Sequence, residues 1–133
     1  AVSGDRILEG LNRLRSSNDL LVIWNQTSGR EISRGYYRSR LSVALSGDEG
    51  KTWKNFKTVE SSPGLAAAED ISPPPVAHIR VDPTAGTLPD GFSMYHYPSL
   101  AFAKGQVFIT YQYDAFKKGK RTRRIKLKRV PES

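Results

Sequence analysis

The sequence predicts an all-β protein made of two antiparallel meanders. Short runs in which apolar and polar residues alternate recur along the chain, as expected for strands with one buried face. They fall into two groups, residues 6–60 and 96–130, and a proline-rich segment at 61–95 separates them. We therefore expect one domain over residues 1–133 that contains two sheets.

The first group predicts four strands joined as a meander. These strands are expected at residues 6–14, 20–24, 38–46 and 54–59. The first has a mixed periodicity that two turns of helix would fit almost as well. The second, Leu20–Trp24, is apolar on both faces and is typical of a central strand. A polar loop is expected at residues 25–37, and the third strand then places Leu41, Val43 and Leu45 on one face.

A tight hairpin is expected between the third and fourth strands. Its sequence is Ser46-Gly47-Asp48-Glu49-Gly50-Lys51-Thr52-Trp53. Asp48 can accept hydrogen bonds from the backbone of its own turn, and Gly50 can adopt a positive φ at little steric cost. Thr52 can fix the far side of the turn, and Trp53 gives the next strand a large side chain to bury.

The segment at 61–95 interrupts this strand pattern. A helical turn at 66–70 and a short strand at 78–81 are the only regular elements expected in it. Because a loop of this length is unusual in a compact domain, we interpret the segment as a functional insertion or a partly mobile region.

The second group predicts three strands, one fewer than the first. They are expected at residues 97–103, 106–113 and 122–130, with a turn at 114–120 between the last two. The final strand alternates between two sets of side chains. Ile125, Leu127 and Arg129 lie on one face, and Arg124, Lys126 and Lys128 lie on the other.

The positive charge of the chain is local. The formal net charge is +8, but nine lysines and arginines lie between Lys117 and Arg129, and the rest of the chain is close to neutral. Such a cluster can hold a phosphate backbone, and Tyr111, Tyr113 and Phe116 are near enough to stack on bases. Nucleic-acid binding is therefore an alternative function, although the alternation of Ile125 and Leu127 first indicates a strand with one solvated face.

The composition excludes several classes of site. There are no cysteines, so disulfides and thiolate metal sites are excluded, and two histidines 18 positions apart are a weak metal signal. We expect no metal and no cofactor. No signal peptide and no membrane-spanning run is visible, and the compartment is left open.

The spacing Ser46-x-Asp48-x-Gly50-x-Thr52-Trp53 resembles the Asp-box of the sialidase (neuraminidase) superfamily and related β-propellers. Leu20–Asn25 and the segment from Tyr95 to Tyr111 are also similar to strands of that family. A propeller blade is a four-stranded antiparallel sheet. The resemblance therefore implies a partial six-bladed propeller, in which residues 6–60 form one blade and 96–130 form a second, incomplete blade.

The resemblance also implies a site. In the family, an arginine about eight residues before the late Asp-box helps to bind the substrate carboxylate. Arg38 fits this position best, and Arg40 is the alternative. Tyr97, in the segment Tyr97-Pro98-Ser99-Leu100, matches the tyrosine that acts as the family's catalytic nucleophile.

Other residues that the family needs for catalysis do not map onto this chain. Its two further arginines, its aspartate acid/base and its glutamate partner come from earlier blades, and Glu9 would supply the glutamate only if the blade were placed earlier. The expected function is a sialidase-like module that processes or binds a sialylated or other acidic glycan, incomplete as a catalyst alone. A non-catalytic module that assembles with copies of itself, or with the remainder of a propeller, is the other alternative.

Overall fold

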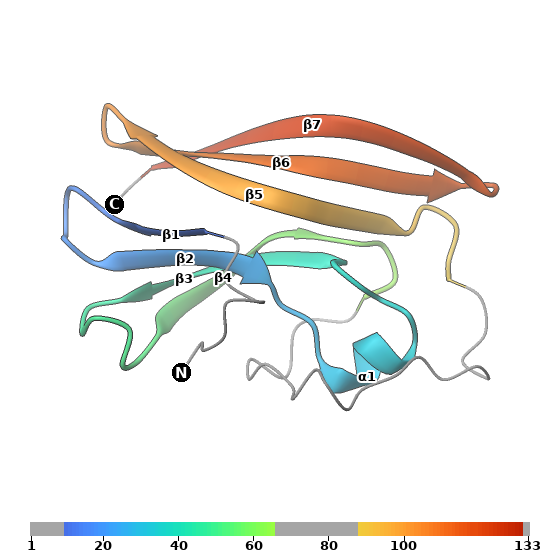
Figure 1. Ribbon diagram of the computed structural model, residues 1–133, viewed down its shortest axis with the longest axis horizontal. Coiled ribbons are helices and arrows are strands. Elements are labelled where there is room, and N and C mark those ends of the chain that lie inside the picture. Colours follow the sequence, from blue (N-terminus) through green and yellow to red (C-terminus); the bar gives the residue numbers. More distant parts are fainter. Residues whose placement is uncertain (1–9, 66–87, 132–133) are drawn as a thin grey trace.

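A computed structural model describes residues 10–65 and 88–131 of the chain (Figure 1). Within these residues the fold is all-β, with two antiparallel sheets and one short helix. The two sheets do not join into a closed ring in the part of the chain that is described. The helical turn expected at 66–70 and the strand expected at 78–81 lie outside the described residues.

The first sheet is the expected four-stranded meander. Its strands pair in the order β1-β2-β3-β4, and they are β1 (Gly10–Arg13), β2 (Leu20–Asn25), β3 (Arg40–Ser46) and β4 (Lys54–Ser61). Leu21 lies opposite Leu45, and Ile23 lies opposite Val43. This register places the alternating apolar residues of β2 and β3 on the same face of the sheet.

The second sheet has three strands, and they are longer than the sequence predicted. They pair in the order β5-β6-β7, and they are β5 (Ser93–Ala103), β6 (Gln106–Lys117) and β7 (Lys120–Pro131). The prediction of a turn over residues 114–120 is wrong, because β6 continues to Lys117 and the chain reverses at Lys118 and Gly119. Asp114 is therefore a buried strand residue and not a turn residue.

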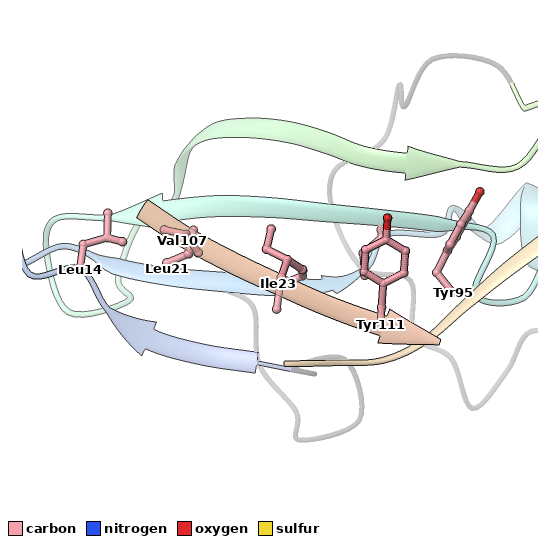
Figure 2. Packing of buried hydrophobic residues seen from close by; sticks show 8 residues of the cluster. Leu14, Leu21, Ile23, Tyr95, Val107 and Tyr111 are labelled. Carbon is pink, nitrogen blue, oxygen red and sulfur yellow. The ribbon is translucent and has the colours of Figure 1, made fainter. Parts of the chain in front are cut away.

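One apolar core lies between the two sheets (Figures 1 and 2). The first sheet contributes Leu21, Ile23 and Leu41, and the second contributes Val107, Ile109 and Tyr111. Tyr95 and Tyr111 meet edge to face with ring centres 6.0 Å apart, an arrangement that aromatic pairs prefer. The hydrophobic effect thus holds the sheets face to face, since neither sheet could bury this face alone.

The turn between β3 and β4 is braced by its own side chains. The Ser46 hydroxyl donates to Asp48 Oδ1 over 2.8 Å, and the backbone N–H of Thr52 donates to the same oxygen over 2.8 Å. The Thr52 hydroxyl also donates to the Asp48 carboxylate. Together these bonds lower the pKa of Asp48 to about 2, and the bond from the Thr52 hydroxyl has the largest effect. Gly50 has φ +87°, and Trp53 packs against the cluster formed by Val22, Trp24 and Ala44.

A short helix, α1 (Gly29–Ser33), interrupts the expected polar loop before β3. It begins with a capping box, in which the Ser28 hydroxyl accepts from the N–H of Glu31 and the Glu31 carboxylate accepts from the N–H of Ser28. The Ser-x-x-Glu spacing is the sequence signal for this helix. The helix positions Glu31 beneath the start of β3, where it meets Arg40.

Candidate functional site

Arg38 and Tyr97 lie together, although they are far apart in the sequence. Arg38 lies in the loop just before β3 of the first sheet, and Tyr97 lies in β5 of the second. The guanidinium carbon of Arg38 lies 5.2 Å from the centre of the Tyr97 ring. The backbones are joined nearby, because the N–H of Tyr95 donates to the carbonyl oxygen of Arg38 over 2.8 Å. The Tyr97 side chain is 70% exposed. The structure therefore brings two of the three predicted site residues to one place on the surface.

The backbone at both residues adopts the left-handed conformation, with φ of 49° at Arg38 and at Tyr97. Tyr97 sits where the pairing of β5 with β6 shifts, between His96 and Ser99. Such a bulge turns a side chain away from the regular alternation of its strand. Strained non-glycine residues of this kind cluster at binding and active sites.

Arg40, the alternative carboxylate-binding residue, lies elsewhere. Its side chain is only 3% exposed, and its guanidinium donates two hydrogen bonds to Glu31, of 2.8 and 2.7 Å. A third bond of 3.1 Å reaches the carbonyl oxygen of Gln26. Burial alone would raise the pKa of Glu31, but the bonds from Arg40 hold this pKa below its ordinary value. Arg40 thus fixes α1 to β3, and this leaves Arg38 as the arginine beside Tyr97.

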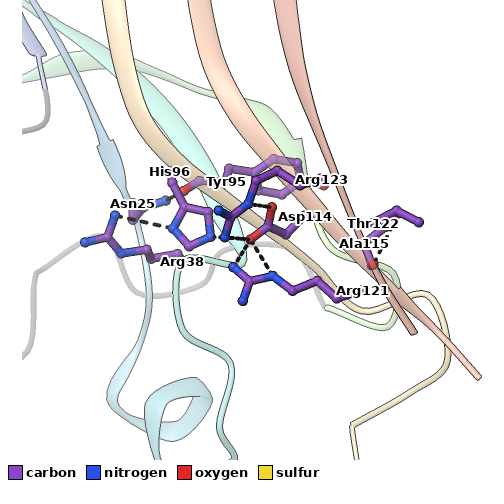
Figure 3. Close-up of polar contacts among 9 residues, drawn as sticks. All are labelled: Asn25, Arg38, Tyr95, His96, Asp114, Ala115, Arg121, Thr122 and Arg123. Atoms are coloured by element: carbon purple, nitrogen blue, oxygen red, sulfur yellow. Dashed lines mark hydrogen bonds and ion pairs between the residues drawn. The ribbon is translucent and has the colours of Figure 1, made fainter. Parts of the chain in front are cut away.

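His96 connects Arg38 to a buried carboxylate (Figure 3). Its Nδ1 lies 3.5 Å from Arg38 Nη1, and its Nε2 lies 3.2 Å from Asp114 Oδ2. Burial lowers the pKa of His96 most strongly, and Arg38 and Arg121 act in the same direction. The Nε2 atom faces the carboxylate without forming a hydrogen bond of acceptable geometry, and Nδ1 is the ring atom nearest the guanidinium.

Asp114 is fully buried at the centre of this polar cluster. Arg121 donates to its Oδ2, and Arg123 Nε donates to its Oδ1 over 3.1 Å (Figure 3). Burial alone would raise the pKa of Asp114, yet the two arginines keep this pKa below its ordinary value. Arg121 and Arg123 thus share one carboxylate, and Arg38 lies on the other side of the His96 ring.

Glu60 forms a second cluster on the other face of β7. It accepts a hydrogen bond from the Tyr111 hydroxyl over 2.9 Å and lies 3.1 Å from Lys126 Nζ. Lys128 Nζ is 3.4 Å from the same carboxylate and donates to the carbonyl oxygen of Val59 over 2.8 Å. Burial raises the pKa of the Tyr111 hydroxyl, and its hydrogen bond to the Glu60 carboxylate raises this pKa further.

Four residues of the basic run form ion pairs with buried or partly buried carboxylates, although their own side chains stay 40–56% exposed. Arg121 and Arg123 pair with Asp114, whereas Lys126 and Lys128 pair with Glu60. This pairing argues against a continuous phosphate-binding stripe along β7, because two carboxylates neutralise part of its charge. Sequence reasoning missed these partners, because Asp114 was expected in a turn and Glu60 just after the end of the fourth strand.

Two further properties limit the chemistry of the site. Among residues 10–65 and 88–131, no group of three metal-binding side chains is close enough to hold an ion, and no carboxylate is hydrogen-bonded to the Tyr97 hydroxyl. No helix among these residues is long and apolar enough to cross a membrane.

Comparison of the chain with family models, with curated proteins and with solved structures found no match.

Proposed function

We propose that this chain is a glycan-binding module of the sialidase-like propeller type, and that it recognises an acidic sugar through Arg38 and Tyr97. The observation that carries the proposal is the convergence of these two side chains. A guanidinium can bind a carboxylate through two parallel hydrogen bonds. The exposed face of an adjacent tyrosine ring can cover the apolar C–H face of the same sugar.

The two sheets support the propeller component of this proposal. The first has the four antiparallel strands of a blade and the second has three. The two sheets pack face to face over an apolar core, as neighbouring blades would. In this arrangement Arg38 comes from the first blade and Tyr97 comes from the second, so the sugar would bind where the two blades meet.

The test is a calorimetric titration with the methyl glycoside of a sialic acid and, for comparison, with a neutral methyl galactoside. We expect only the acidic sugar to bind. Arg38→Gln should weaken this binding about 10- to 100-fold, because a hydrogen-bonded charge is lost. The matched control is Arg30→Gln, which removes an exposed arginine of α1.

Two outcomes decide the test. Equal binding of the acidic and neutral sugars, or full affinity in Arg38→Gln, would contradict the proposal. Hydrolysis of a fluorogenic sialoside that is lost in Tyr97→Phe would extend the proposal from binding to catalysis.

An assembly role is the second candidate, and the outer face of the second sheet favours it. Ile125 and Leu127 are 81% and 62% exposed on this face. Exposed apolar side chains that lie together often mark interaction surfaces. The solution mass tests the role, because a species near the chain mass of 14.8 kDa would exclude self-association, whereas a trimer would support it.

A further inference from the structure

An apolar cleft of about 530 Å³ opens into the core between β4 and β7, which are edge strands of the two sheets in the part of the chain that is described. Buried side chains of both sheets form its floor, among them Leu14, Leu21 and Val107 (Figure 2). Val59 of β4 and Val130 of β7 are only partly buried and form its rim. The volume lies within the range of small-molecule pockets, which is roughly 300–1,000 Å³.

An irregularity in the pairing of β3 with β4 accompanies this opening. The register shifts between Val43 and Leu45 of β3, and Asn55, which lies between their partners on β4, has φ 56°. Irregularities of this kind bend a strand away from its regular course. Val43, Leu45 and Asn55 all line the cleft, and the two apolar residues are only partly buried. Apolar side chains of the core are therefore accessible along this edge.

The charged residues that line the cleft are both lysines, Lys57 of β4 and Lys128 of β7, and no described carboxylate lines it. Lys57 lies opposite Val43 in the pairing of β3 with β4, which places its side chain on the core face of the sheet. This side chain is exposed and forms no ion pair with another described residue. Lys128, in contrast, lies 3.4 Å from the Glu60 carboxylate. Lys57 is therefore the cation of the cleft that is open to an anionic ligand.

The shape and polarity of the cleft indicate the kind of ligand. Its wall along β4 runs from Asn55 to Val59, a length of about 13 Å at the usual rise of a strand. Because the floor is hydrocarbon, a sugar hydroxyl buried there would lose its hydrogen bonds to water without replacement. A linear hydrocarbon chain gains free energy by leaving water along its whole length. An anionic group at the end of that chain would meet Lys57.

We propose that the cleft binds a free fatty acid of medium chain length, whose acyl chain lies between the two sheets and whose carboxylate pairs with Lys57. This site goes beyond the proposed glycan function and shares no residue with the Arg38–Tyr97 site. A lysine on an edge strand also discourages edge-to-edge pairing of sheets. That role alone predicts no binding of a fatty acid that depends on Lys57.

The experiment measures the affinity of octanoate, decanoate and dodecanoate by calorimetry, below the micelle concentration of each. One molecule should bind per protein chain. Each added pair of methylenes should tighten the binding about 10-fold, because both methylenes leave water. Dodecyltrimethylammonium has the same chain length and the opposite charge, so it should bind about 10-fold more weakly than dodecanoate.

Two substitutions locate the ligand. Lys57→Gln should weaken dodecanoate binding about 5-fold, because an exposed charge pair is lost. The matched control is Lys120→Gln, which removes an exposed lysine at the other end of β7 from the cleft and should have no effect. Val130→Phe should abolish binding because the larger ring fills the cleft. Circular dichroism checks its fold, and Lys57→Gln decides the test if this variant does not fold.

Three results would overturn the proposal: no saturable binding of dodecanoate to folded protein, an affinity that does not rise with chain length, and an affinity that Lys57→Gln leaves unchanged. Uptake of several dodecanoate molecules per protein chain would indicate detergent-like binding and would also overturn it. Self-association that Val130→Phe abolishes, without fatty-acid binding, would show that a second copy of the chain fills the cleft instead. None of these results involves Arg38, so the proposed function is tested separately.

Discussion

The two sheets share one core but differ in their opposite faces. The first sheet is also buried on its outer side, where Val22, Trp24 and Ala44 form a second apolar cluster. The second sheet has longer strands, and its outer side carries exposed Ile125 and Leu127 together with the buried Asp114 cluster. The first sheet is thus covered by apolar packing on both sides, whereas the second exposes apolar side chains on its outer side.

The largest expected effect tests this difference between the outer faces directly. Trp24→Ala should destabilise the protein by about 3–5 kcal/mol, because it opens a cavity in a fully packed cluster. Ile125→Ala on the second sheet should change stability by less than about 0.5 kcal/mol. Urea unfolding followed by circular dichroism measures both. A comparable loss from Ile125→Ala would mean that the outer face of the second sheet is also covered.

Removal of the Asp114 carboxylate should have the next largest effect. Asp114→Ala leaves Arg121 and Arg123 without their shared partner, and we expect a loss of roughly 2–3 kcal/mol, moderated because both arginines reach solvent. The matched control is Asp90→Ala, which removes an exposed carboxylate of the same region. Unchanged urea midpoints for Asp114→Ala would show that this cluster does not stabilise the second sheet.

The Glu60 cluster should contribute less. Glu60→Gln weakens the contacts to Lys126 and Lys128 but can keep a hydrogen bond from Tyr111, so a loss of about 1–2 kcal/mol is expected. Glu49→Gln, which affects only the exposed pair with Arg13, should have no measurable effect. Equal urea midpoints for the two variants would show that the partly buried Glu60 carboxylate stabilises the protein no more than the exposed Glu49 carboxylate does.

The smallest effect concerns pH. The pKa of His96 is lowered in the folded protein from its ordinary value of 6.5, so the unfolded chain binds the proton more readily. Stability should therefore fall as the pH decreases below about 6.5. The lowered pKa values of Glu60 and Asp114 add a further loss at more acidic pH, as these carboxylates become protonated.

Thermal unfolding at a series of pH values separates the two contributions. His96→Gln should reduce the loss of stability that begins below about pH 6.5, and it should leave the loss at more acidic pH in place. A profile between pH 7 and 5 that the substitution leaves unchanged would show that His96 does not titrate between Asp114 and Arg38.

Much of the fold follows from the sequence, because local patterns set it. A continuous apolar run predicted β2, alternation predicted β3, and turn chemistry predicted the hairpin at Asp48. The helix α1 was missed, although Ser28 and Glu31 carry its capping signal. These features depend on neighbours within a few residues, where sequence reasoning is strongest.

The errors arose where distant residues decide the outcome. Apolar character predicted that Ile125 and Leu127 are buried, but both are exposed. Lys126 and Lys128 occupy the face of β7 toward the first sheet instead, because they bond to Glu60 and to the carbonyl oxygen of Val59 on β4. The expected turn at 114–120 included Asp114. The arginines that hold this carboxylate in a strand come from β7, and the residues next to Asp114 in the sequence do not indicate them. The proximity of Arg38 and Tyr97 depends on the packing of two sheets, which no spacing along the chain records.

The alternating contacts of β7 have a consequence for insertions and deletions. Successive residues of this strand serve opposite faces, with Arg121 and Arg123 on Asp114 and Lys126 and Lys128 on Glu60. A single added or deleted codon between Arg123 and Lys126 would move one pair of ion-pairing residues to the wrong face and leave the other in place. A two-residue change would restore the alternation of faces but would shift one pair along the strand by about 7 Å, away from its carboxylate.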